Sequence, residues 1–313
     1  MLHKESFIID FSQSAELFMK IKEALLHKKT LVSDGAWGTF LHAKGLKAGE
    51  CPELWNVTHP EAVLDIAKNY IAAGADMIET NSFGGSRFKL EHYGLADRAY
   101  ELNKAAAALS KKAAGDDHFV LGSIGPTGKI LMMGDVSKNE LYDVFKEQAT
   151  ALAEGGADAI VVETMTAIDE AVLAIKAAKE NTDLEVICTF TFDQTIDGDY
   201  KTMMGVSPVI MAAAVVEAGV DIIGTNCGNG MKKMVDIVSA LKGAAPGVPI
   251  LVHANAGAPV IEDGATVFPE TPEEMFELVP ALINAGADII GGCCGTSPDH
   301  ISAIQRAVGL TSK

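Results

Sequence analysis

A phrase that occurs four times along the chain constrains its fold more than any other feature. The copies read AAGADMIETNSF from Ala72, EGGADAIVVETM from Glu154, EAGVDIIGTNCG from Glu217 and NAGADIIGGCCG from Asn284. In each copy an alanine-rich helix ends at a glycine able to adopt the left-handed conformation, and a short apolar run then indicates a buried strand. The chain therefore repeats one helix-to-strand turn.

The spacing of the copies predicts the number of strands. Their glycines, at positions 74, 156, 219 and 286, lie 82, 63 and 67 residues apart, about twice the roughly 30 or more residues of a βα unit. One further strand is expected before each copy: TLVSDGAWG at 30–38, HFVLGSIGP at 118–126, EVICTFTF at 185–192 and PILVHANAG at 249–257. Eight strands alternating with helices predict an α/β fold, a (β/α)8 TIM barrel with an extra N-terminal helix, rather than an open doubly wound sheet.

The predicted barrel leaves a short segment at the N-terminus. We divide the chain into an N-terminal helical extension over 1–29 and a barrel domain over 30–313. The extension contains the amphipathic stretch SAELFMKIKEALLHKK, whose apolar spacing predicts a helix packed outside or under the barrel.

Charge and cysteine content exclude several classes of function. The chain has 25 basic and 42 acidic side chains, a formal net charge of −17, and no cluster of Lys or Arg. Nucleic acid and anionic membranes are therefore not expected as partners. We find no secretory signal or membrane span, so a cytoplasmic location is expected. Five cysteines, an odd number, argue in that compartment against a disulfide framework and leave metal binding, nucleophilic catalysis or core packing.

The repeat also predicts where the chemistry lies. Active sites of (β/α)8 barrels are built at the C-terminal ends of the strands. The residues seven and eight positions after the repeat glycines are Asn81 and Ser82, Glu163 and Thr164, Asn226 and Cys227, Cys293 and Cys294. All eight are polar or carry a thiol, and each pair follows an apolar strand, so we expect them on the catalytic face.

Three of these residues are cysteines, which together suggest a metal site. Cys227 and the Cys293–Cys294 pair belong to alternate strands, about 10 Å apart at Cα, and are able to share one ion. Three thiolates leave a fourth tetrahedral position open, as in a catalytic zinc site. Flanking glycines are expected to let the backbone aim both adjacent thiols at the ion. A disulfide between adjacent cysteines is disfavoured by geometry, and Cys51 and Cys188 are interpreted as ordinary buried or loop thiols.

An open three-cysteine zinc site is suited to one of two reactions. It either activates a water molecule for hydrolysis or activates a thiol that binds the metal. Three thiolates reduce the ability of the ion to acidify water and favour a soft sulfur ligand. We therefore favour thiol alkylation.

Several motifs carry a resemblance to a known family. They are DGAWGT at 34–39, CPELWNVTHPE at 51–61, AGADMIETNSFGG at 73–85, GSIGPTGK at 122–129, GTNCG at 224–228 and GGCCGTSPDHI at 291–301. Together they resemble the homocysteine S-methyltransferase family over roughly residues 30–308, in particular the homocysteine-binding zinc barrel of cobalamin-dependent methionine synthases, here as a stand-alone domain.

The resemblance implies roles for individual residues. Cys227, Cys293 and Cys294 match the cysteines that bind the zinc ion activating homocysteine, and they are the expected catalytic residues. Asp34 and Glu163 match the carboxylates that bind the substrate amino group. Strand-end residues are further candidates to bind the substrate or orient the metal ligands: Thr80, Asn81, Ser123 and Asn226, with His253 and Asn255 as weaker candidates.

The source of the methyl group is less directly implied. Methionine synthases of the family carry folate and corrinoid modules, which this sequence does not contain. We expect homocysteine to be methylated to methionine by methylcobalamin on a separate corrinoid protein. The alternative is methyl transfer between another methylated small molecule, such as S-methylmethionine, betaine or a demethylase substrate, and a thiol or corrinoid acceptor.

Overall fold

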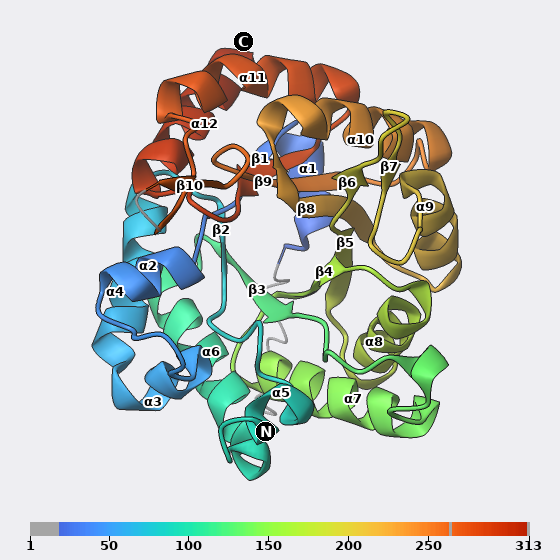
Figure 1. The fold of residues 1–313 in the computed structure, drawn as a ribbon. Coiled ribbons are helices and arrows are strands. Elements are labelled where there is room, and N and C mark those ends of the chain that lie inside the picture. The colour runs from blue at the N-terminus through green and yellow to red at the C-terminus, as the bar shows by residue number, and fades with distance from the viewer. Residues whose placement is uncertain (1–18, 263–264, 312–313) are drawn as a thin grey trace, which may run out of the picture.

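The computed structural model describes residues 19–262 and 265–311 and confirms the predicted α/β barrel (Figure 1). The eight strands of the main sheet are β1 (Leu31–Val32), β2 (Met77–Glu79), β3 (Phe119–Ile124), β4 (Ala159–Met165), β5 (Glu185–Phe190), β8 (Ile222–Gly230), β9 (Ile250–Asn255) and β12 (Ile289–Gly292). They are parallel, in the order β1-β12-β9-β8-β5-β4-β3-β2. A parallel bridge between Ser33 and Met77 joins the two edge strands, so the sheet closes on itself.

Helices surround the strands in a ring (Figure 1). They are α2 (Gly38–Ala43), α3 (Trp55–Thr58), α4 (Pro60–Ala72), α5 (Arg87–Glu91), α6 (Ala99–Ala114), α7 (Lys138–Glu154), α8 (Ile168–Asn181), α9 (Pro208–Glu217), α10 (Met231–Ala244), α11 (Pro272–Ala285) and α12 (Pro298–Thr311). Short 3-10 helices span Pro52–Leu54 (η1), Ala96–Arg98 (η2) and Leu131–Met133 (η3). Two hairpins pair β6 (Asp193–Gln194) with β7 (Tyr200–Lys201) and β10 (Val260–Glu262) with β11 (Ala265–Val267). No helix within the described ranges is long and apolar enough to cross a membrane.

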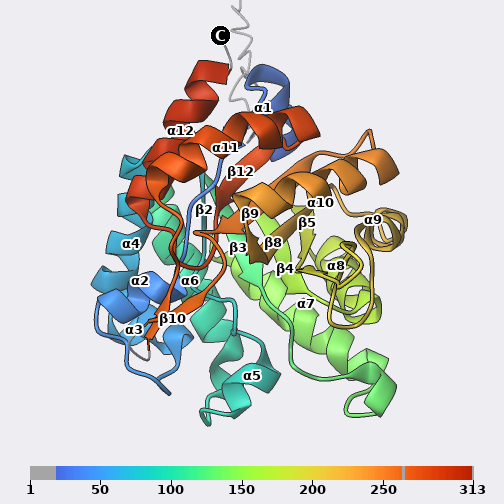
Figure 2. The same ribbon diagram turned by 45° about the horizontal axis from the view of Figure 1, so that its top comes forward.

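The N-terminal helix α1 (Ile21–His27) closes one end of the barrel. Its buried Ile21 packs against side chains that fill the barrel interior, including Leu121 and Ile222. The carboxylate of Glu185, at the start of β5, accepts a hydrogen bond from the backbone N–H of Ile21 at 2.6 Å. Figure 2 shows α1 at the opposite end of the barrel from β10. The helix therefore packs under the barrel, whereas residues 1–18 of the predicted extension lie outside the described residues, and the domain boundary stays a prediction.

The four repeat glycines have the backbone conformation that the sequence predicts. Their φ angles are +97° at Gly74, +101° at Gly156, +90° at Gly219 and +111° at Gly286. A residue with a Cβ rarely adopts such angles. Each glycine thus ends its helix and lets the chain turn into the next strand.

The repeat contains a second element, an aspartate two residues after each glycine, which ties neighbouring strands together. The carboxylates of Asp76, Asp158, Asp221 and Asp288 accept hydrogen bonds from the backbone N–H groups of Val32, Val120, Val186 and Ile250 at 2.7, 2.8, 2.8 and 2.9 Å. Each aspartate also pairs with a lysine: Lys28, Lys111, Lys179 and Lys242, respectively. The chain therefore uses one device four times to join each repeat strand to the strand before it.

We expect Asp158→Ala to lower the free energy of unfolding by about 1–3 kcal/mol, because the N–H of Val120 loses its carboxylate acceptor. Chemical denaturation would measure this change. Asp183→Ala, at an exposed aspartate in the loop after α8, is the matched control and should change the stability by less than about 0.5 kcal/mol. Equal effects of the two substitutions would contradict the assigned role.

Candidate active site

The three predicted thiols come together at the C-terminal ends of β8 and β12. The sulfur atoms of Cys227, Cys293 and Cys294 all lie within 4.8 Å of one another, and the Sγ atoms of Cys227 and Cys294 are 3.9 Å apart. The strand β9 separates β8 from β12, as expected for alternate strands. Cys51 and Cys188 are buried elsewhere, and all five cysteines are free.

The protein backbone brings adjacent thiols into one cluster by tight packing rather than by glycine flexibility before the pair. Of the nearby glycines, Gly295 has a positive φ of +79°, whereas Gly291 and Gly292 do not. A Cβ on Gly292 would lie 2.3 Å from Oγ1 of Thr296. Gly292 is therefore required because Thr296 packs closely on the strand end, where its hydroxyl donates to the carbonyl of Cys293 at 2.7 Å. Gly291 is required because a Cβ there would lie 2.7 Å from the carbonyl oxygen of Asp34.

Hydrogen bonds among the three thiols lower the pKa of Cys227 and raise the pKa values of the other two. Bonds from Cys293 and Cys294 lower the pKa of Cys227 to about 3, with Asn255 as a further donor. The same contact with Cys227 raises the pKa of Cys293 and raises that of Cys294 to about 11. Of the three thiols, Cys227 is therefore the one that ionises most readily.

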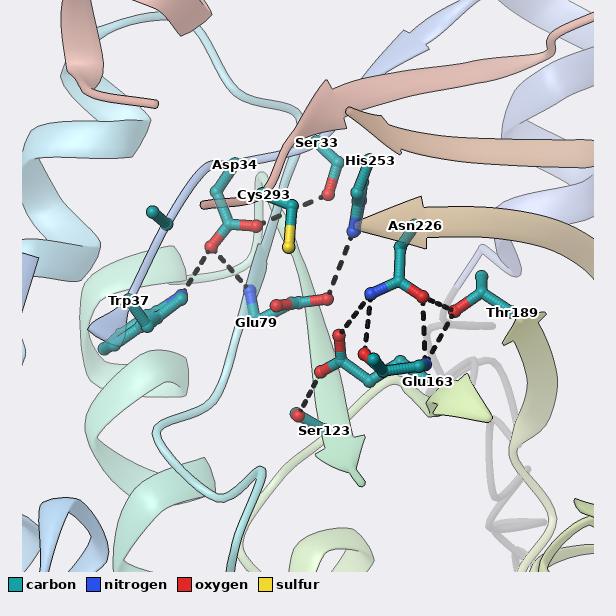
Figure 3. A network of polar contacts seen from close by, with 12 residues as sticks. Ser33, Asp34, Trp37, Glu79, Ser123, Glu163, Thr189, Asn226, His253 and Cys293 are labelled. Atoms are coloured by element: carbon teal, nitrogen blue, oxygen red, sulfur yellow. Dashed lines mark hydrogen bonds and ion pairs between the residues drawn. The ribbon is translucent and has the colours of Figure 1, made fainter. Parts of the chain in front are cut away.

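Two buried carboxylates, the partly buried carboxylate of Glu79 and a histidine lie beside the thiols (Figure 3). Asp34, which follows β1, accepts hydrogen bonds from the indole N–H of Trp37 at 2.8 Å and from the backbone N–H of Glu79 at 2.9 Å. Glu163, on β4, accepts a short hydrogen bond from the hydroxyl of Ser123. The side chain of Glu79 lies 3.4 Å from Nδ1 of His253.

Burial makes these acids harder to ionise. It raises the pKa of Asp34 to about 7 and that of Glu79 to about 8. Burial, followed by the charge of Glu79, also raises the pKa of Glu163 well above its ordinary value, and burial lowers the pKa of His253. Buried carboxylates are costly unless a cation pairs with them. The cluster is therefore suited to bind a cationic group.

Carboxylates and thiols face the same cavity, which has a volume of about 370 Å³. Its lining includes Glu79, Glu163, His253 and the three cysteines, together with a wall formed by residues 35–39. This arrangement places a cation-binding group and a sulfur cluster within reach of one small molecule.

The other predicted strand-end residues lie nearby but bond to the protein. The hydroxyl of Thr80 accepts a hydrogen bond from the backbone N–H of Ser123 at 2.9 Å. The amide of Asn81 donates to the carbonyl of Pro52 and to the side chain of Asn56. Asn226 bonds to residues on β4 and β5. Direct binding of substrate by these side chains stays a prediction, and the structure shows them holding the walls of the cavity.

The prediction from sequence missed Glu79 and gave His253 and Asn255 as weaker candidates. Glu79 ends the strand MIE, five residues after Gly74. The strand-end positions predicted from the repeat lie seven and eight residues after each glycine and therefore do not include it. A charged residue within a buried strand was the available signal. In His253 and Asn255, the atoms Nε2 and Oδ1 are buried and have no hydrogen-bond partner among the described residues, which indicates groups reserved for a ligand.

Comparison with known proteins identifies the family of this chain. The sequence model of the family described as homocysteine S-methyltransferase matches residues 31–308. The methionine synthases of Mycobacterium tuberculosis (strain ATCC 25618 / H37Rv) and Mycobacterium leprae (strain TN) are both 34% identical to this chain, over 91% and 90% of it. The matched regions make up 25% and 24% of those proteins, so this chain spans about a quarter of the length of these curated relatives.

Solved structures support the fold. The metallated form of the homocysteine methyltransferase MmuM from Escherichia coli has a TM-score of 0.74 and 24% identity, over 90% of this chain and 98% of that one. The carboxyl transferase domain of Rhizobium etli pyruvate carboxylase has a TM-score of 0.52 and 16% identity, over 92% of this chain and 48% of that one. Because the family match covers nearly the whole barrel, including all three clustered cysteines, this chain belongs to the homocysteine S-methyltransferase family and is a methyltransferase.

Proposed function

We propose that this protein methylates homocysteine to methionine, using a zinc ion held by Cys227, Cys293 and Cys294. The observation that carries the proposal is the shared cavity, in which a cluster of three thiols faces buried carboxylates. Homocysteine has the matching groups, a thiol at one end and an ammonium group at the other.

The thiol cluster suits zinc. With Zn–S bonds of about 2.3 Å, tetrahedral geometry requires sulfur atoms about 3.8 Å apart, and Cys227 and Cys294 are 3.9 Å apart. Three soft sulfur donors favour zinc over harder ions. The unpartnered Oδ1 of Asn255 lies on a side chain that contacts Cys227, so a further polar atom is available beside the cluster. When bound, zinc lowers the pKa of a thiol that joins its ligands and so supplies a nucleophilic thiolate at neutral pH.

The protein's own groups bind and orient the substrate. In this proposal Asp34 and Glu163 pair with the ammonium group, because burial opposes the ionisation of both carboxylates and a cation beside them offsets that cost. Trp37 and Ser123 hold the two carboxylates in place through hydrogen bonds. The substrate sulfur then displaces the leaving group of the donor from the methyl carbon, and catalysis comes from thiolate activation and alignment.

Exposed apolar side chains on loops that follow the barrel strands support a protein as the carrier of the methyl donor. Met132 and Met203 are each 82% exposed, in the loops after β3 and β5. These two loops line a second cavity of about 280 Å³, which also includes Ile130 and Met204. Exposed apolar patches often mark protein contacts, and methionine suits adaptable ones. We therefore favour methylcobalamin on a separate corrinoid protein.

Assays with a panel of donors test this proposal. We expect purified, zinc-loaded protein to form methionine from homocysteine and free methylcobalamin at least about tenfold faster than from S-methylmethionine, betaine or S-adenosylmethionine, because the proposed partner presents the same methyl–cobalt bond. Mass spectrometry would quantify methionine. Faster turnover with S-methylmethionine or betaine would support a small-molecule donor instead, and no methionine from any donor would reject homocysteine as the acceptor.

A further inference from the structure

Thr164 has a backbone conformation that is costly for its residue type. Among the described residues, Thr164 and Cys227 are the non-glycine residues with positive φ, at +59° and +58°. Such angles are unfavourable for L-residues and especially for β-branched ones such as threonine. Cys227 belongs to the thiol cluster, whereas the proposed chemistry gives Thr164 no role.

The two strained residues occupy equivalent positions. Each lies eight residues after its repeat glycine, Gly156 or Gly219. The pairing register is also irregular at both places, after Val162 on β4 and after Asn226 on β8. The strain is thus a shared feature of two strand ends that lie on either side of β5.

Hydrogen bonds to Asn226 hold Thr164 in this conformation. The backbone N–H of Thr164 donates to Oδ1 of Asn226 at 2.9 Å, and the amide of Asn226 donates to the hydroxyl of Thr164 at 2.7 Å. Oδ1 also accepts a bond from the hydroxyl of Thr189 on β5 at 2.7 Å. The second amide hydrogen is directed to Glu163, at 3.4 Å. Asn226 is completely buried, and these four contacts use its full hydrogen-bonding capacity.

This network connects two parts of the site. Thr164 follows Glu163 directly, and Asn226 precedes Cys227 directly. The bridge from Thr164 to Asn226 therefore links the carboxylate on β4 to the thiol on β8. Because the side chain of Asn226 bonds to both the backbone N–H and the hydroxyl of Thr164, neither strand end is free to shift without breaking these bonds.

We propose that Thr164 is a positioning and specificity-determining residue, whose bridge to Asn226 sets the separation between the ammonium-binding carboxylate of Glu163 and the sulfur cluster. The inference rests on the proposed function, because it assumes that Glu163 binds the amino group. Homocysteine and cysteine differ by one methylene between the amino-bearing carbon and the sulfur. A fixed distance between Glu163 and the sulfur cluster selects homocysteine, the longer thiol. If that distance can vary, the site also accepts cysteine, the shorter one.

Thr164→Val removes the hydroxyl and keeps the side-chain shape. We expect the KM for homocysteine to rise about tenfold with kcat changed by less than about twofold, and the preference for homocysteine over cysteine to fall about tenfold. Thr164→Ser keeps the hydroxyl and should restore both values. With 4-mercaptobutyrate, which is homocysteine without its amino group, Thr164→Val and the wild type should react equally.

Controls separate this role from a general structural one. Thr182→Val, at the end of α8, removes a hydroxyl that bonds to Ala178 and should leave all these values unchanged. Zinc content should stay at one ion per chain in every variant. If Thr164→Val fails to fold, Thr189→Val weakens the same network from β5 and should change the preference in the same direction.

Two results would overturn the inference: an unchanged KM and preference in a folded Thr164→Val protein, or an equal loss with homocysteine and 4-mercaptobutyrate. Failure of the proposed function gives a different result, because wild-type protein would then not methylate homocysteine with any donor.

Discussion

Cys294→Ala is expected to abolish zinc binding and to reduce methyl transfer to homocysteine by more than about 1,000-fold. The substitution leaves two sulfur ligands, Cys227 and Cys293, at a site that needs three to hold the metal. Loss of a group that merely supports a ligand typically costs 10–100-fold in metal affinity or activity, and loss of the ligand itself should cost more. Metal analysis of purified protein and a methionine assay would measure the two effects.

The barrel should remain folded in this variant. Cys294 is half-buried at the cavity, outside the packed core, so circular dichroism and thermal unfolding should resemble those of the metal-free wild type. Cys188→Ala is the matched control, because Cys188 lies in the core away from the cluster, and it should retain zinc and activity. Full activity in a Cys294→Ala protein without zinc would reject the proposed mechanism.

Glu163→Gln is expected to raise the KM for homocysteine about 10–100-fold with little change in kcat. The substitution removes the charge that pairs with the substrate ammonium group. A hydrogen bond to a charged group contributes about 1.5–3 kcal/mol, and each 1.4 kcal/mol corresponds to a tenfold change in affinity. The amino group is remote from the methyl group being transferred, so its loss of binding should affect the ground and transition states alike. Steady-state kinetics would separate the two constants.

A control at the other end of the barrel tests whether the effect is local. Glu185→Gln changes a carboxylate that bonds to the N-terminus of α1 and should leave the KM unchanged. An unchanged KM in Glu163→Gln would refute the assignment of this residue. Loss of zinc in that variant would instead show that Glu163 supports the metal site.

Much of the molecule could be predicted because the repeat aligns distant segments. Cys227 and Cys294 are 67 residues apart, yet both lie eight residues after a repeat glycine, and their sulfur atoms are 3.9 Å apart. A constant offset from each repeat glycine places equivalent residues at equivalent depths of the barrel. The same argument indicated Glu163 as a residue of the cavity.

Other parts of the site depend on side-chain contacts between strands, which the sequence repeat does not predict. The sequence placed Asn226 at a strand end on the catalytic face. Its four contacts with β4 and β5, which join those strands to β8, became apparent only in the structure. Glu79 and His253 come from strands far apart in the sequence and face each other across the barrel mouth. Their pairing was not predictable from either strand alone.

The sequence by itself determined the number and order of the strands, and therefore which residues share the catalytic end, because apolar runs and glycine turns recur with a regular spacing. The tertiary structure alone decided which of those residues line the cavity and which hold their neighbours. Hydrogen bonds depend on differences of a few tenths of an ångström and on backbone angles such as the positive φ of Thr164. Those quantities are set by packing between strands once the barrel has closed.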